Sequence, residues 1–101
     1  MTATHASIST ALKCAAVPLT RQVVAAFPDA HVVLTDVGGT MARGTFQSTA
    51  RWVVATDAAT VAIVSYAVEG WCIVPVVDGM KRDGECADTL AECVSALRVR
   101  G

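Results

Sequence analysis

Cysteine and histidine are the residue types with the most reactive side chains in this sequence of 101 residues. The four cysteines are Cys14, Cys72, Cys86 and Cys93, and no two of them form a C-x-x-C pair. Each lies in an apolar stretch, so we expect reduced, buried thiols that pack as small hydrophobic side chains. If Cys86 and Cys93 share one helix, they lie too far apart along its axis to form a disulfide.

The two histidines do not indicate a metal site. His5 and His31 are far apart in the sequence, and neither belongs to a pair with ligand spacing. A nucleophilic Cys-His pair is also weakly indicated, because buried thiols without a cationic neighbour are inert. The sequence therefore predicts no catalytic residues, no metal and no cofactor, and it favours a non-enzymatic protein without excluding an enzyme.

A glycine-containing segment follows the apolar run Val32–Leu34. The segment Asp36–Arg43 reads Asp-Val-Gly-Gly-Thr-Met-Ala-Arg, and it resembles the first phosphate motif of bacterial glucokinases and related sugar kinases, with Met41 where that family usually has Asn. The resemblance implies a glycine hairpin whose backbone amides approach nucleotide phosphates. It assigns phosphate binding to four residues: Asp36, Gly38, Gly39 and Thr40. A plain hairpin turn explains the same glycines, so a nucleotide- or phosphate-binding domain is an alternative function.

The elements that would position these residues begin with a helical region. Apolar residues recur at a helical period from Ile8 to Phe27, which predicts an N-terminal helical region. Pro18 removes one helix hydrogen bond in its middle, so one kinked helix and two short helices both fit the pattern. We expect residues 1–7 to be disordered and the helical region to end at Phe27-Pro28-Asp29.

Four β-strands are predicted in the middle of the chain. They cover four ranges: His31–Val37, Thr45–Thr56, Thr60–Val68 and Trp71–Val77. Gly38-Gly39 is expected to form the turn after the first strand, and Glu69-Gly70 the turn between the last two. Pro75 cannot donate a hydrogen bond to a neighbouring strand, so the fourth strand should lie at a sheet edge or contain a bulge.

An apolar stripe predicts a C-terminal helix. Its members are Cys86, Leu90, Cys93, Val94 and Leu97, and Asp83 is the expected N-cap. The expected fold is a single α+β domain over residues 1–101, with a four-stranded antiparallel β-meander flanked by an N-terminal helical region and a C-terminal helix (α-β-β-β-β-α).

This order of elements is similar to that of double-stranded-RNA-binding domains, which run helix, three strands, helix. The similarity implies binding of nucleic acid through a basic cluster at the start of the last helix. Only Lys81 and Arg82 precede that helix here, and the acidic residues Asp83, Glu85 and Asp88 would repel a phosphate backbone. Nucleic-acid binding is therefore a weaker alternative function.

The composition favours a protein that associates with another protein. Apolar residues make up 53% of the chain and charged residues 17%. The last two strands are apolar on both faces, which is more surface than one layer of helices can cover. We therefore expect a non-enzymatic protein-protein interaction protein, a homodimer or a binder of a protein partner, that uses an apolar sheet face or an edge strand. Its interface is assigned to five residues: Trp52, Tyr66, Trp71, Ile73 and Val77.

Two further expectations concern location and origin. The N-terminus lacks the features of a signal peptide, and Val61–Val77 is too short and too interrupted to cross a membrane as a helix. We expect a cytoplasmic protein without a membrane span. The abundance of Ala, Val and Arg and the absence of Asn are typical of a GC-rich genome, and the small size would suit an accessory or bacteriophage-encoded factor.

Overall fold

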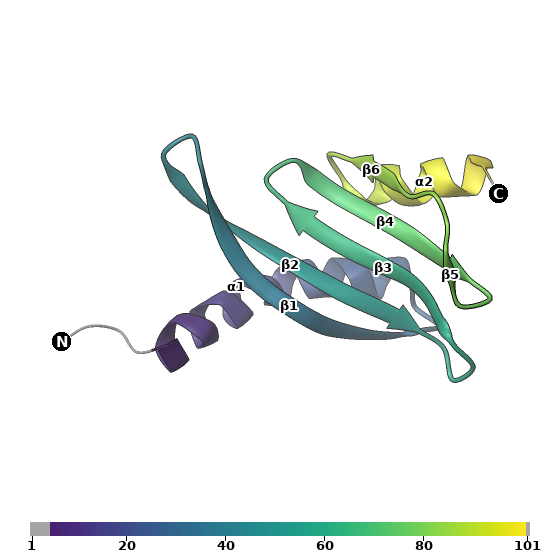
Figure 1. Cartoon of the computed structure of the whole chain (residues 1–101), viewed down its shortest axis with the longest axis horizontal. Helices are drawn as coiled ribbons and strands as arrows, with labels where there is room; N and C mark the ends of the chain where they lie inside the picture. The colour runs from purple at the N-terminus through teal and green to yellow at the C-terminus, as the bar shows by residue number, and fades with distance from the viewer. Residues whose placement is uncertain (1–4, 101) are drawn as a thin grey trace.

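The part of the chain that the structure describes folds into two helices and one antiparallel sheet (Figure 1). The computed structural model describes the backbone of residues 5–100 and the side chains of residues 14–39, 41, 43–45 and 47–99. The elements are α1 (His5–Ala26), β1 (His31–Ala42), β2 (Thr45–Ala55), β3 (Thr60–Ala67), β4 (Gly70–Val77), β5 (Met80–Lys81), β6 (Glu85–Ala87) and α2 (Leu90–Arg100). The predicted α+β class is confirmed, and β5 and β6 are two short strands beyond the four expected.

The N-terminal region is one helix with Pro18 inside it. Pro18 and Cys14 are both exposed, so water can bind the Cys14 carbonyl that loses its helix partner. The helix begins at His5, so the last three residues of the segment 1–7, which we expected to be disordered, are helical. Residues 1–4 lie outside the described part of the chain.

Strand β1 is longer than predicted because Gly38 and Gly39 do not turn the chain. Both glycines lie inside β1, opposite Thr49 and Ser48 of β2. The turn is made instead by Arg43-Gly44, with φ of 53° and 75°. Two consecutive positive φ values are what a tight two-residue hairpin requires, and Gly44 adopts one without steric cost. The predicted turn at Gly38-Gly39 is therefore wrong.

The sheet has the strand order β1-β2-β3-β4-β5, and β6 pairs with the same edge of β4 as β5 does. Pro75 lies between the part of β4 that pairs with β5 and the part that pairs with β6. Its carbonyl accepts a hydrogen bond from the Arg82 backbone N–H at 2.8 Å. The missing N–H of Pro75 therefore breaks no regular strand pairing, which is how β4 accommodates a proline.

The C-terminal helix starts later than predicted. Glu85–Ala87 is strand β6, so Cys86 lies in a strand and not on the helix. The cap is Thr89, whose Oγ1 accepts a hydrogen bond from the Glu92 backbone N–H at 3.2 Å. The prediction of Asp83 as N-cap is therefore wrong, because pairing with β4 takes the residues before Asp88 into the sheet.

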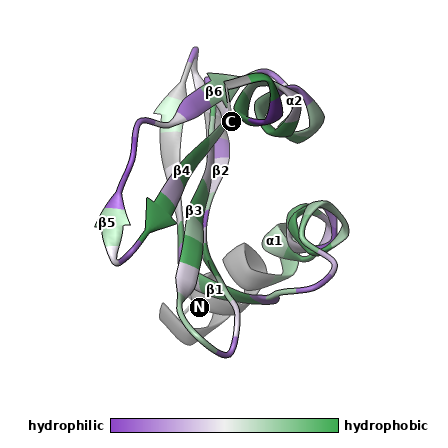
Figure 2. Ribbon diagram, turned by 90° about the vertical axis from the view of Figure 1, so that its right-hand side faces the viewer, coloured by the Kyte–Doolittle hydropathy of each residue, from purple (hydrophilic) through white to green (hydrophobic). Residues whose placement is uncertain are grey.

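Both helices cover the same face of the sheet, and the core lies between the helix layer and the sheet (Figure 2). The buried side chains come from both layers: Ala16, Val23, Ala50, Trp52, Val54, Ala62, Val64, Trp71, Ile73, Leu90 and Cys93. The indole Nε1–H of Trp52 donates to Thr20 Oγ1 at 2.8 Å, which joins α1 to β2. The rings of Trp52 and Trp71 stack with centroids 5.6 Å apart. The stacked rings belong to β2 and β4, and they form part of the core that the helices cover.

Candidate functional site

The sheet face opposite the helices carries an apolar row that crosses four strands. Val33, Val53, Ile63 and Val74 are successive cross-strand partners on β1, β2, β3 and β4. Val33 is 54% exposed, and the other three are half-buried. We call the face that carries this row the open face, because neither described helix covers it (Figure 2). Such a face is a candidate binding surface, since continuous apolar surface on a soluble domain commonly marks a contact site.

One end of the open face is polar. Asp36 lies opposite Arg51, and Ser65 follows on β3 in the same row. Thr35 is the irregular residue of β1, and its hydroxyl donates to the Arg51 carbonyl at 3.2 Å. The region borders a depression of about 450 Å³ that also includes Gly38. The open face therefore joins an apolar row to a border with both signs of charge.

The glycine motif does not have the geometry of a phosphate loop. Gly38 and Gly39 are in extended backbone within β1. Successive N–H groups of a strand point to opposite edges, whereas a phosphate loop needs consecutive N–H groups that converge on one anion. Asp36 adds a carboxylate beside them, and the Thr40 side chain lies outside the described side chains. The phosphate-binding alternative therefore gains no support from this backbone.

Three of the five predicted interface residues lie in the core. Trp52, Trp71 and Ile73 are 0%, 4% and 1% exposed. They hold the helices on the sheet, so they are not accessible to a partner in the folded chain. Tyr66 is half-buried against Trp71, with ring centroids 4.9 Å apart, whereas Val77 is exposed at the end of β4.

The apolar row was missed because alternation along one strand shows which residues share a face but not which face the helices cover. The apolar runs on both faces of β3 and β4 were the available signal. Aligning the strands by register would have placed Val53, Ile63 and Val74 side by side.

Two of the four cysteines form a disulfide. Cys72 and Cys86 are directly opposite in the pairing of β4 with β6, and their sulfur atoms are bonded. The prediction of reduced thiols is therefore wrong for this pair, because Cys86 lies on a strand next to Cys72. Cys14 and Cys93 are free. Burial raises the pKa of the Cys93 thiol, which donates to the Trp71 carbonyl at 3.2 Å, so it is a packing residue and not an activated nucleophile.

The histidines and carboxylates that the structure describes are the remaining candidates for a metal site. His31 Nε2 lies 3.1 Å from Asp57 Oδ1, with both side chains largely exposed, and the His5 side chain is outside the described set. Among the residues that the structure describes, no group of three His, Cys, Asp or Glu side chains could hold a metal ion. Over the same residues, no helix is long and apolar enough to cross a bilayer.

The basic pair expected just before the last helix is separated from it by a strand. Lys81 is in β5 and Arg82 follows it, and β6 separates both from the start of α2 at Leu90. The arrangement implied by the similarity to double-stranded-RNA-binding domains is therefore not formed.

Comparison of the chain with protein-family models, curated proteins and solved structures found no match. The α+β fold and the open face are therefore the features from which a function can be argued.

Proposed function

We propose that this chain is a non-enzymatic protein-interaction module that forms a homodimer through its open face. The observation that carries the proposal is the apolar row Val33, Val53, Ile63 and Val74, which no described helix covers. A sheet with an apolar face packs well against a second such sheet, at a separation of about 10 Å. A second copy supplies that sheet without any further component.

The charges of the chain support self-association. A net charge of −1 gives little repulsion between two copies. A two-fold contact uses the same surface on both copies, so a residue of one copy can contact a different residue of the same surface on the other copy. Because Asp36 and Arg51 lie together beside the apolar row, Asp36 of one copy can approach Arg51 of the other. A border with both signs suits such a contact, whereas a border with one sign would oppose it.

Light scattering during size-exclusion chromatography tests the proposal. Val33→Asp places a charge in the apolar row at a side chain that is 54% exposed, so the fold should tolerate it. The parent should have the mass of a dimer and Val33→Asp that of a monomer. Val99→Asp is the matched control, because Val99 is 87% exposed on α2, away from the open face. A monomeric parent, or a dimeric Val33→Asp with normal circular dichroism, would contradict the proposal.

We also infer that the protein works in an oxidising compartment and not in the cytoplasm that the sequence suggested. The Cys72–Cys86 disulfide supports this inference, because disulfides persist in oxidising compartments and are rare in the cytosol. Alkylating the cells that make the protein as they are lysed, followed by mass spectrometry, would measure the pair in place. Labelling of both cysteines without prior reduction would contradict the inference.

A further inference from the structure

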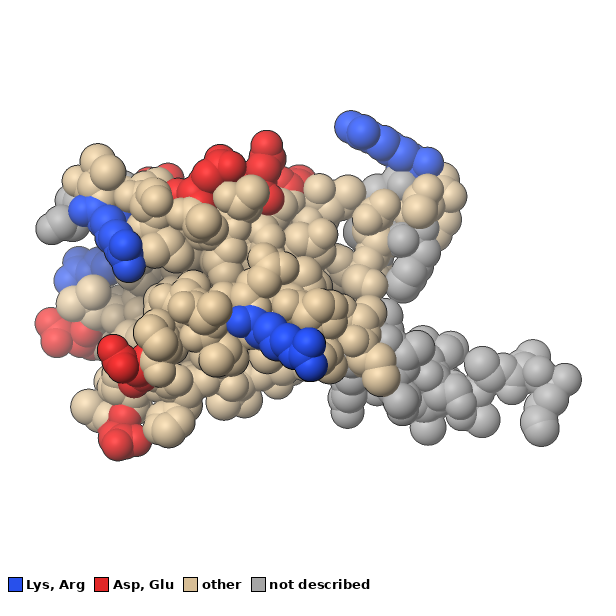
Figure 3. Space-filling view, turned by 180° about the vertical axis from the view of Figure 1, so that it is seen from behind, with Lys and Arg blue, Asp and Glu red and all other residues tan. Residues whose placement is uncertain are grey.

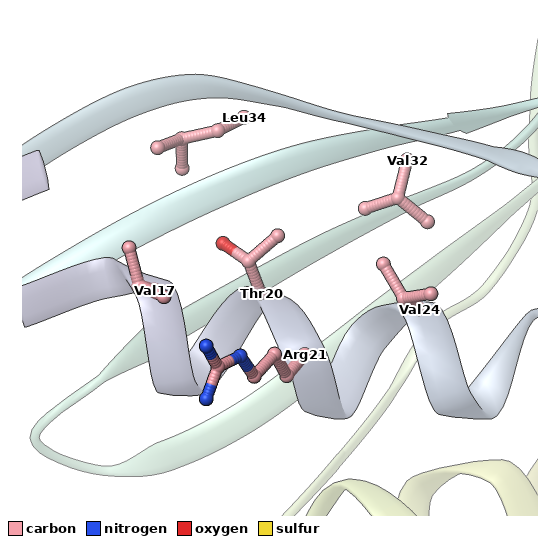
Figure 4. A pocket seen from close by; sticks show the side chains of 6 residues that line it. All are labelled: Val17, Thr20, Arg21, Val24, Val32 and Leu34. Atoms are coloured by element: carbon pink, nitrogen blue, oxygen red, sulfur yellow. The ribbon is translucent and has the colours of Figure 1, made fainter. Parts of the chain in front are cut away.

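A groove lies on the helix side of the sheet, between α1 and the edge strand β1 (Figure 4). Its volume is about 560 Å³, within the range of about 300–1,000 Å³ that small-molecule sites occupy. Six residues line it: Val17, Thr20, Arg21, Val24, Val32 and Leu34. Val17 and Val24 are 46% and 48% exposed, so the apolar wall on the helix is open to an incoming ligand.

The hydroxyl in the groove is already used by the fold. Thr20 Oγ1 accepts the indole N–H of Trp52 at 2.8 Å and donates to the Ala16 carbonyl at 2.9 Å. Its single proton is therefore not free for a ligand. This leaves the Arg21 guanidinium as the donor among the lining side chains.

Arg21 is a cation on a largely uncharged surface. Figure 3 shows the molecule from behind, where one basic side chain lies near the middle of the face on uncharged atoms and the acidic side chains lie toward the top and the left. No carboxylate with a described side chain forms an ion pair with Arg21. An apolar groove with one available guanidinium is complementary to an apolar chain with one anionic end.

We propose that this groove binds the anion of a fatty acid, with the hydrocarbon chain along Val17, Val24, Val32 and Leu34 and the carboxylate on Arg21. The guanidinium can hold a carboxylate through two parallel hydrogen bonds. A second copy of the chain fits the groove less well, because a two-fold contact presents the same patch on both copies and would bring a second Arg21 instead of an anion. The groove lies on the helix side, so this proposal does not depend on the dimer at the open face.

The test is an NMR titration with dodecanoate below its micelle concentration. We expect saturable methyl shifts confined to the valines and the leucine of the groove. The Trp52 indole N–H signal should also move, because its acceptor Thr20 lines the groove. Shifts spread over the open face instead, or no saturation, would overturn the proposal.

Variants and a second probe test the role of the charge. Arg21→Gln should weaken dodecanoate binding about tenfold, the factor expected for loss of one charge-assisted contact. Arg98 is also exposed but lies on α2, so Arg98→Gln should leave the affinity for dodecanoate unchanged. Dodecyltrimethylammonium, which has the same chain and the opposite charge, should bind more weakly than dodecanoate to the parent. Equal binding of the two probes, or equal affinity of Arg21→Gln and the parent, would overturn the assignment of a carboxylate site.

Discussion

Removing the Cys72–Cys86 disulfide should lower the free energy of unfolding by about 3 kcal/mol. The bond joins residues 14 apart in sequence. In the chain-entropy description, a loop of about 15 residues restricts the unfolded chain by this amount at 25 °C. Cys72 is half-buried and Cys86 is exposed, so replacing both with serine creates no core cavity that would add to the loss.

For a chain of this size, 1 kcal/mol corresponds to a change of about 4–8 °C in Tm. The double variant Cys72→Ser/Cys86→Ser should therefore unfold about 12–24 °C below the parent in a calorimetric scan. Reducing the parent with a phosphine should have the same effect, since both treatments remove the same constraint. Cys14→Ser is the control, because Cys14 is an exposed free thiol.

Two results would refute this reasoning. A thiol titration of the unfolded, unreduced parent should detect Cys14 and Cys93 alone, so detection of all four thiols would mean that the bond does not form. The second result is a disulfide that is present in the parent, together with a double variant that unfolds at the temperature of the parent. The disulfide would then not restrict the unfolded chain by the amount calculated from the loop length, and the value of about 3 kcal/mol would be wrong.

Two other perturbations test the core. Thr20→Val should cost about 1–3 kcal/mol in urea unfolding, because it leaves the buried Trp52 indole N–H without its acceptor, while Thr20→Ser keeps the hydroxyl and should cost less. Burial raises the pKa of Cys93 above its ordinary value of 9.0, so the folded thiol keeps its proton to higher pH than the unfolded one. The contribution of the protonated Cys93 thiol to the free energy of unfolding should be complete below pH 9.0. It should be lost as the pH rises through the raised pKa of the thiol in the folded state. Unfolding curves of the parent and Cys93→Ala should therefore converge above pH 9.0, and a constant difference would contradict this assignment.

The sequence predicted the elements whose patterns are local. Alternation along β2 placed Trp52 and Val54 on one face, and both are fully buried. The helical period after Leu90 placed Cys93 on the buried side of α2. In both cases the element packs one apolar face on a single layer, so the spacing of apolar residues along the chain matches the spacing of buried residues.

Other features depend on partners distant in sequence, and no local pattern contains them. Gly38 is typical of turns, but its pairing with Thr49 keeps it in an extended strand. Cys86 fits the helical stripe of Leu90 and Cys93, yet it lies opposite Cys72 in the sheet and bonds to it. The side of the sheet that the helices cover is likewise set by long-range packing. For this reason the two tryptophans assigned to an interface lie in the core, and the row that includes Val33 was not recognised.

The disulfide and the proposed dimer should be coupled, because Cys72 lies on the open face. Cys72 pairs with Ser65, which is in the same cross-strand row as Asp36 and Arg51, so a second copy on that face would restrict access of a reductant to the bond. Thiol-disulfide exchange requires the attacking thiolate to reach a sulfur atom. Reduction by excess dithiothreitol should therefore slow as the protein concentration rises and the dimer forms.

Val33→Asp, which is designed to keep the chain monomeric, should lose this dependence and be reduced at the fast rate at every concentration. Val99→Asp should behave as the parent does. A parent that is dimeric by light scattering but is reduced at one rate throughout would place the dimer contact away from the open face.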